Sequence, residues 1–187
     1  MNVLLIVLDS VRAANCSLYG YRRDTTPELD ALAAESTVYD GARAPSNWTV
    51  PSHVSTFTGL PTHVHGVTIH DRLDPGHTVF ERLAASGYDT GLFTRNGFLA
   101  SHEVGIHEAF ETVETADDGF DGGSRGDGFD DAERLLAWVD DREEPWAACL
   151  NLMDAHRPFE PRDEHDRWGD AAARTLQSEL DARWETQ

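Results

Sequence analysis

The sequence predicts an α/β domain with a mostly parallel β-sheet and helices on both faces. Short apolar runs typical of buried strands alternate with amphipathic stretches typical of helices. Chemically useful side chains follow several of the apolar runs, at the strand ends where ligands bind in parallel sheets. We expect one domain over residues 1–187, because no internal repeat or clear linker divides the chain.

The first predicted strand is the run Asn2–Leu8, which is followed by Asp9. Its lack of polar interruptions is expected for a strand buried on both faces of a parallel sheet. A helix is expected to begin at Pro27, because Thr26 precedes it as a capping residue. Residues 37–42 are a candidate second strand.

The stretch 47–59 predicts the start of a short helix. Pro51 suits a first helical position, because its missing N–H would be unpaired there, and Gly59 is placed to supply a left-handed C-terminal residue. Thr49 then lies where a helix N-terminus directs free N–H groups, a natural place for phosphate or sulfate. From this stretch alone, the threonine hydroxyl is either a helix cap or a nucleophile.

The middle of the chain carries several histidines and a helix–strand unit. His63 and His65 would share one face of a strand and could bind a metal, but solvated or hydrogen-bonded loop histidines are the alternative. Thr78 is expected to cap a helix that stops before Gly87. Residues 88–94 are expected to follow as a strand.

The next segment, residues 111–131, is acidic and rich in glycine. It matches no calcium-loop pattern, so we expect a flexible surface loop. An amphipathic helix is expected over residues 130–140, with Leu135, Leu136 and Val139 directed inward.

The last predicted strand, residues 146–153, leads directly to Asp154 and His156, and a helical pattern follows over residues 170–184. Asp9 follows one strand and Asp154 another, and we expect the Thr49 loop to follow a third. Because the carboxyl ends of parallel strands meet at one edge, these groups are predicted to lie together.

The charge balance excludes some classes of partner. The chain has 34 acidic residues against 15 basic ones, all of them arginine, and a formal net charge of −19. Such a charge repels nucleic acid and anionic membranes, and it is typical of proteins adapted to high salt. With two cysteines and no apolar run long enough to span a bilayer, the sequence favours a halophilic, cytoplasmic protein.

The strand-end residues favour metal-assisted ester chemistry. A threonine hydroxyl is a poor nucleophile unless a metal or a base helps it lose its proton. A divalent cation held by Asp9 could coordinate Thr49 and polarise a phosphoryl or sulfuryl oxygen, and His156 could bond the substrate or protonate a leaving group. The alternatives are a capping role for Asp9 and a loop hydrogen bond for His156.

The chain resembles the sulfatase branch of the alkaline phosphatase superfamily from residue 2 to about residue 160. Matching motifs occur in the family's order: NVLLIVLDSVR (2–12), YGY (19–21), TPELD (26–30), PSH (51–53), TGL (58–60), HGV (65–67) and LMDAHRPF (152–159). An unrelated flavodoxin-like binding domain would explain the strand pattern but not this ordered set of motifs.

The resemblance implies hydrolysis or transfer of a small sulfate or phosphate ester at one divalent cation (Ca, Mg, Mn or Zn). By position, Asp9 corresponds to the first metal ligand and Thr49 to the catalytic nucleophile, which would also contact the metal. His156 corresponds to a catalytic, substrate-contacting histidine. His53 and Asp154 are the further candidates for substrate binding.

Two departures from the family pattern narrow this expectation. Formylglycine sulfatases resemble C-x-P-S-R or S-x-P-S-R where this chain has Thr49 and His53, and threonine cannot yield the formylglycine aldehyde. Relatives with threonine at this position are phosphoester enzymes that keep the hydroxyl. The family's later Asp-His metal ligands are not found before Gln187. The alternative is therefore a truncated, non-catalytic relative that binds an oxyanion or a protein partner.

Overall fold

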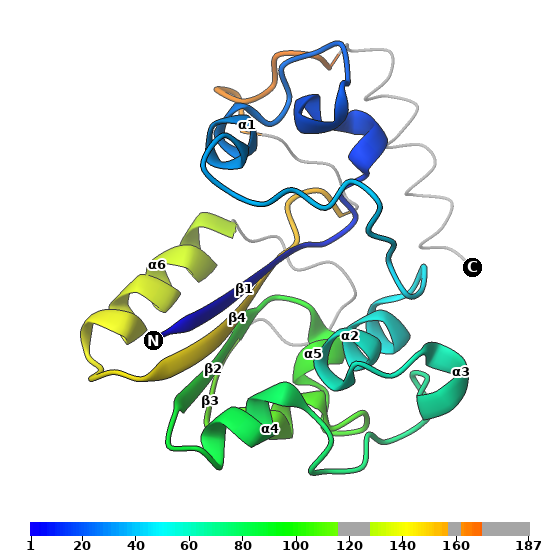
Figure 1. The fold of residues 1–187 in the computed structure, drawn as a ribbon, viewed down its shortest axis with the longest axis vertical. Coiled ribbons are helices and arrows are strands. Elements are labelled where there is room, and N and C mark those ends of the chain that lie inside the picture. The colour runs from blue at the N-terminus through cyan, green and yellow to red at the C-terminus, as the bar shows by residue number, and fades with distance from the viewer. Residues whose placement is uncertain (116–127, 157–161, 170–187) are drawn as a thin grey trace.

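A four-stranded, all-parallel sheet forms the centre of the computed structural model, which describes residues 1–115, 128–156 and 162–169 (Figure 1). The strands are β1 (Val3–Leu8), β2 (Asp89–Thr94), β3 (Thr112–Glu114) and β4 (Trp146–Leu152), in the spatial order β1-β4-β2-β3. The predicted fold class is confirmed.

Helices connect the strands and cover the sheet. In chain order they are η1 (Ala13–Asn15), η2 (Ser17–Tyr19), α1 (Pro27–Ala33), α2 (Thr49–Thr58), α3 (Thr62–His65), α4 (Val79–Ala84), α5 (Gly97–Ala100), η3 (Ile106–Ala109) and α6 (Gly128–Asp140). The expected capping threonine of α4 is confirmed, because Thr78 and Glu81 form a reciprocal capping box.

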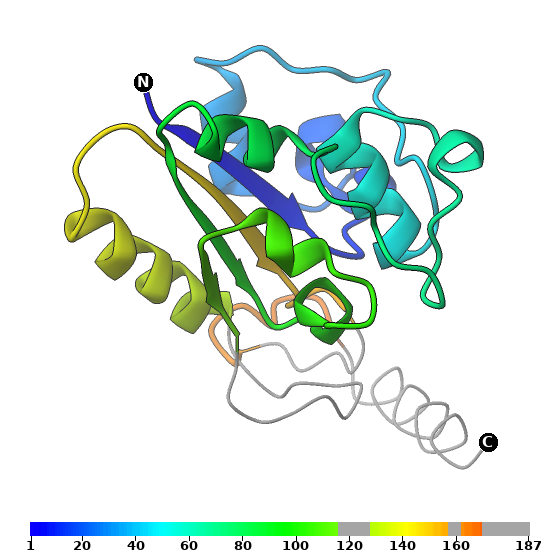
Figure 2. The ribbon, with the colours of Figure 1, turned by 90° about the horizontal axis from the view of Figure 1, so that it is seen from below.

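The sheet separates two hydrophobic cores. Figure 2 shows α6 on one side of the strands and α2 and α4 on the other. Successive side chains of a strand point to opposite faces, so Leu92 enters the larger core with α2 and α4, while Phe93 packs under α6. β2 and β4 are buried on both faces, as their apolar sequences predict. The loops that follow β2 and β4 therefore begin from buried, well-packed strand ends.

The strand β1 is buried on one face only. Val3, Leu5 and Val7 pack against the larger core, whereas Leu4 and Ile6 are 44% and 51% exposed. Burial on both faces was therefore the wrong expectation for this strand. The physical reason is its position: β1 lies at the edge of the described sheet, and α6 covers β4 and β2 instead.

The inward face of α6 also differs from the prediction. Leu135 is buried and Val139 half-buried, but Leu136 is 62% exposed, and Trp138 takes the inward position. The Trp138 ring packs on Phe93 with 5.6 Å between centroids, and Arg142 Cζ lies over the same indole at 4.2 Å from its centroid. The large indole fills the space between helix and sheet, and this sets the rotation of the helix.

Two local predictions were wrong. Residues 37–42 form no strand, since Val38 and Tyr39 are exposed and no neighbouring strand pairs with them. His63 and His65 lie on the short helix α3, not on a strand, because Pro61 and Gly66 favour a single helical turn between them.

The expected acidic loop over residues 111–131 was partly wrong, because residues 112–114 pair with β2 as strand β3 and residues 128–131 belong to α6. Residues 116–127 of that loop and the expected helix at 170–184 lie outside the described residues. Within the described ranges, no helix has the length and apolar character needed to cross a membrane.

The rotation of α6 can be tested with two adjacent leucines. Leu135→Ala should lower the free energy of unfolding by about 2–4 kcal/mol, because it removes buried methyl groups and leaves a cavity. Leu136→Ala should change it by less than about 0.5 kcal/mol. Urea denaturation of both variants measures the difference, and equal losses would contradict this packing.

Candidate active site

The parallel topology brings three strand ends to one edge of the sheet. β1 ends at Asp9, whose backbone N–H donates to the Leu152 carbonyl of β4 at 2.9 Å. β2 ends at Thr94, two residues before Asn96. The loop before α2 brings Thr49 to the same place, so the predicted meeting of Asp9 and Thr49 occurs through Asn96.

Asn96 is the central residue of this edge. Its Nδ2 donates to Asp9 Oδ2 at 3.2 Å and to Thr49 Oγ1 at 3.3 Å, and Met153 Sδ lies within 3.5 Å of the same nitrogen. Its Oδ1 accepts from the Phe98 N–H and caps α5. Asn96 is only 5% exposed, so the amide is fixed before any ligand arrives.

Sequence reasoning missed Asn96. The available signal was an asparagine two residues after a buried strand and just before Gly97, a pattern that favours a helix cap. That signal explains only the bond from Oδ1 to the α5 backbone. The bonds from Nδ2 to Asp9 and Thr49 depend on the strand order, in which β2 lies next to β4 and β4 next to β1. The local sequence does not encode that order.

Thr49 is the first residue of α2, not its cap. Trp48 occupies the N-cap position in an extended conformation. The helix begins two residues earlier than predicted, so Pro51 is its third residue and not its first. Gly59 ends the helix with φ +72°, as expected. The Thr49 hydroxyl bonds the Asn96 amide and leaves the helix backbone uncapped.

His53 lies one turn along α2, beneath Thr49. Its Nδ1 lies 2.9 Å from the Thr49 carbonyl, which can only accept, so Nδ1 carries the proton. In the neutral ring Nε2 is then an acceptor, and Asn151 Nδ2 approaches it at 3.5 Å. His53 is 5% exposed, and its predicted contact with substrate stays a prediction that this burial disfavours.

Burial lowers the pKa of the His53 imidazole below its ordinary value of 6.5, while the bond to the Thr49 backbone and the charge of Asp9 oppose that shift. The neutral ring matches its place between one acceptor and one donor.

Thr94 and Asn151 close the network behind the site. Thr94 Oγ1 donates to Asn151 Oδ1 at 3.0 Å and accepts from the Asn96 backbone N–H at 2.9 Å. Both residues are fully buried. A continuous chain of hydrogen bonds therefore runs from Asn96 through Thr94, Asn151 and His53 to the backbone of Thr49.

His156 and Asp154 follow β4 at the same edge. The backbone N–H of His156 donates to the Met153 carbonyl at 2.8 Å, in a turn that leaves Asp154 exposed. His156 lines a cavity of about 580 Å³ together with Ser10 and Arg12, which directly follow Asp9. The cavity thus adjoins the strand ends and is large enough to receive a small organic group.

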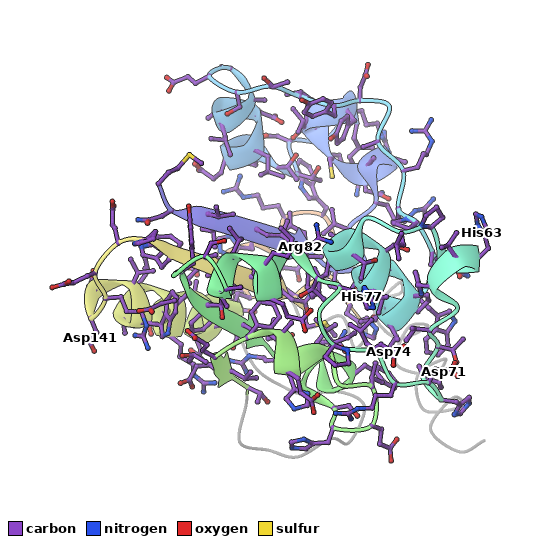
Figure 3. All side chains as sticks on the ribbon, turned by 60° about the horizontal axis from the view of Figure 1, so that its bottom comes forward. His63, Asp71, Asp74, His77, Arg82 and Asp141 are labelled. Atoms are coloured by element: carbon purple, nitrogen blue, oxygen red, sulfur yellow. The ribbon has the colours of Figure 1, made fainter. Side chains whose placement is uncertain are left out.

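A second cavity, of about 260 Å³, lies at the other end of α2 between Thr58 and His77. Figure 3 shows His77 with Asp71 and Asp74 on the segment between α3 and α4. Ten helical residues span about 15 Å, so this cavity is well separated from Thr49.

The strand-end oxygens suit a hard divalent cation. Asp9 is half-buried, and in the described parts of the chain no arginine or histidine forms an ion pair with it. A carboxylate and a hydroxyl held by one amide provide oxygen ligands of the kind that Mg²⁺, Mn²⁺ or Ca²⁺ prefer.

Comparison with known proteins shows the family of the chain. The family described as Sulfatase matches residues 1–179. The chain belongs to the sulfatase family. No curated protein sequence matches it significantly.

Solved structures support the sulfatase fold. The phosphonate monoester hydrolase of Agrobacterium radiobacter has a TM-score of 0.72 at 20% identity, over 88% of this chain and 43% of that one. The periplasmic domain of EcEptC from Escherichia coli, in complex with Zn, has a TM-score of 0.67 at 18% identity, over 96% of this chain and 54% of that one.

A putative sulfatase from Bacteroides thetaiotaomicron has a TM-score of 0.66 at 21% identity, over 83% of this chain and 35% of that one. This sulfatase-family chain therefore spans about half, or less, of the length of these structural relatives.

The buried histidine predicts a pH dependence of stability. Because the folded pKa of His53 lies below 6.5, the unfolded chain binds a proton that the folded chain resists. This contribution to stability is complete above pH 6.5, falls as the pH drops from 6.5 towards the lowered pKa of the folded state, and levels off below it. Wild type should lose more unfolding free energy below pH 6.5 than His53→Gln does.

Denaturant melts over a pH series measure this difference, with the exposed His63→Gln as a control that keeps the wild-type profile. Parallel profiles for wild type and His53→Gln would contradict the buried, neutral ring.

Proposed function

We propose that this chain carries the nucleophile side of a metal-dependent active site for small sulfate or phosphate esters, and that phosphoesters are its substrates. Thr49 is the nucleophile, Asp9 and Thr49 hold the cation, and His156 with Asp154 contacts the ester. Asn96 joins this set as the amide that positions Thr49.

The observation that supports this proposal most is the shared Asn96 amide. A helix-capping threonine would direct its hydroxyl to the helix backbone, whereas Thr49 directs its hydroxyl to a nitrogen that also bonds Asp9. An N–H donor on Thr49 Oγ1 stabilises the negative charge that develops there when the hydroxyl loses its proton. The geometry therefore suits attack by an alkoxide.

The residues around Thr49 favour phosphoester over formylglycine chemistry. Threonine would give a ketone on oxidation, so the formylglycine aldehyde is not accessible at this position. His53, which takes the place of the arginine in the formylglycine pattern, is buried below the helix start and bonded to the Thr49 carbonyl. It orients the hydroxyl-bearing residue through the backbone.

In the proposed reaction, Thr49 Oγ1 forms a bond to phosphorus and loses its proton to solvent. The bond from phosphorus to the ester oxygen breaks, and the departing alkoxide takes a proton, for which His156 is the candidate donor. Water or an acceptor alcohol then releases the phosphoryl group from Thr49. A bound divalent cation supplies positive charge for the phosphoryl oxygens and the threonine alkoxide.

We place the leaving group in the cavity beside His156. It begins at Ser10, next to Asp9, and extends to Thr25 and Thr26. Arg12 on its wall would favour a leaving group that carries negative charge.

The excess of acidic side chains supports a further proposal about environment. A net charge of −19 without any lysine is tolerated best where salt screens repulsion between carboxylates. We therefore propose a high-salt, cytoplasmic setting for this chain.

A second candidate function is binding without turnover. Catalytic metal sites usually have about three protein ligands, and within the described ranges the strand ends bring together one carboxylate and one hydroxyl. Such an incomplete metal site would hold an oxyanion or a protein partner without cleaving an ester.

One set of variants separates the two functions. Thr49→Ala should lower the metal-dependent hydrolysis of a p-nitrophenyl phosphoester by on the order of 10³-fold or more, because no hydroxyl remains to attack. Thr49→Ser should keep measurable activity, and Thr37→Ala, at an exposed threonine outside the site, should match wild type.

Turnover that survives Thr49→Ala would contradict the role of Thr49. No turnover by wild type, combined with binding of orthovanadate that depends on Asp9, would favour the non-catalytic function.

A further inference from the structure

Three side chains of types that serve as ligands of transition metals lie close together in the segment after α5. His102, His107 and Glu108 each offer one ligand atom, and these atoms all lie within 4.8 Å of one another. The two imidazole rings meet edge to face with 4.5 Å between centroids. No part of the proposed ester chemistry uses these residues.

We infer that His102, His107 and Glu108 form a second metal site, one that binds Zn²⁺. Two imidazoles and one carboxylate are a common zinc ligand set, and they leave the fourth tetrahedral position open for water. Zinc-bound nitrogen and oxygen atoms lie about 2 Å from the ion, so small side-chain rotations would bring these ligands into range.

The backbone around the cluster is already held in place. Ile106 and Ala109 are buried at 0% and 6% exposure, and they fix the 3₁₀ turn η3 that carries His107 and Glu108. The half-buried ring of His107 has its Nδ1 enclosed and without a hydrogen bond of ordinary geometry.

Arg72 orients the rest of the cluster. Its Nη1 donates to the His102 carbonyl at 2.6 Å, and its Nη2 pairs with Glu108 Oε1. The pair leaves Glu108 Oε2 available as a ligand atom, and a carboxylate bonded on one side is typical of ordered metal ligands. Arg72 is 51% exposed, so its charge is largely solvated and opposes a cation only weakly.

An ion pair and a ring contact could account for the cluster without a metal. That alternative explains the position of Glu108, but it gives no reason why two imidazoles and a carboxylate each place a ligand atom within 4.8 Å of the others. It also makes a different prediction, because ions bound only by the acidic surface would not depend on His102. Mg²⁺ competes for carboxylates and hardly for imidazole, which makes the two cases separable.

The test uses the full chain after treatment with EDTA, with Zn²⁺ titrated calorimetrically in a large excess of Mg²⁺. Asp9→Asn provides the background, because it removes the candidate catalytic ligand. In this background Zn²⁺ binding should persist, and addition of His102→Ala should weaken it at least ~10-fold. Glu108→Gln, a milder change, should weaken binding in the same direction.

The matched control is His70→Ala, which removes another exposed histidine and should leave the Zn²⁺ affinity unchanged. Circular dichroism confirms the fold of each variant. Equal Zn²⁺ affinity with and without His102, or equal losses for His102→Ala and His70→Ala, would overturn the proposed site.

Discussion

The bridging amide of Asn96 is the interaction on which the rest of the candidate site depends. It donates to a carboxylate from the end of β1 and to a hydroxyl from the start of α2, two groups that are 40 residues apart in the chain. The amide itself is fixed by its cap on α5 and by its backbone bond to Thr94. Its position therefore depends on the turn that leads from the end of β2 into α5.

Burial makes this arrangement stiff. Thr94, Asn151 and His53 are enclosed between the sheet and α2, where an unpaired polar group would be costly. Each of the three uses its neighbour as a partner, so a change at one position disturbs the next. The network holds both ends of the Thr49 residue: His53 bonds its backbone carbonyl, and Asn96 bonds its hydroxyl.

The order of the strands determines which side chains meet at the candidate site. Because β1, β4 and β2 are neighbours and parallel, their carboxyl ends supply Asp9, His156 and Asn96 to one edge. The adjoining cavity is lined by His156 and by Ser10, the residue after Asp9. A family defined by ester chemistry is consistent with this edge.

Sequence reasoning predicted the features that depend on local pattern. The apolar runs predicted β1, β2 and β4, and the positions of Asp9 and His156 at the sheet edge followed from where those runs end. The Thr49 loop was expected to follow a strand, which was wrong, because residues 37–42 form none and α2 begins at Thr49 itself. Features set by tertiary packing were missed.

The rotation of α6 depends on which apolar side chain fills the gap above Phe93, and Trp138 does so where Leu136 was expected. The exposed face of β1 depends on its place in the strand order. Asn96 was missed for the same reason, since its partners come from distant parts of the chain.

The central claim is that the Asn96 side chain bonds Asp9 and Thr49 at the same time. NMR of the ¹⁵N-labelled chain tests it directly through the side-chain amide resonances of Asn96, with the exposed Asn47 as an internal reference. Both Asp9→Asn and Thr49→Ala should shift the Asn96 amide protons and leave those of Asn47 in place. Asn96 resonances that respond to neither change would contradict the account.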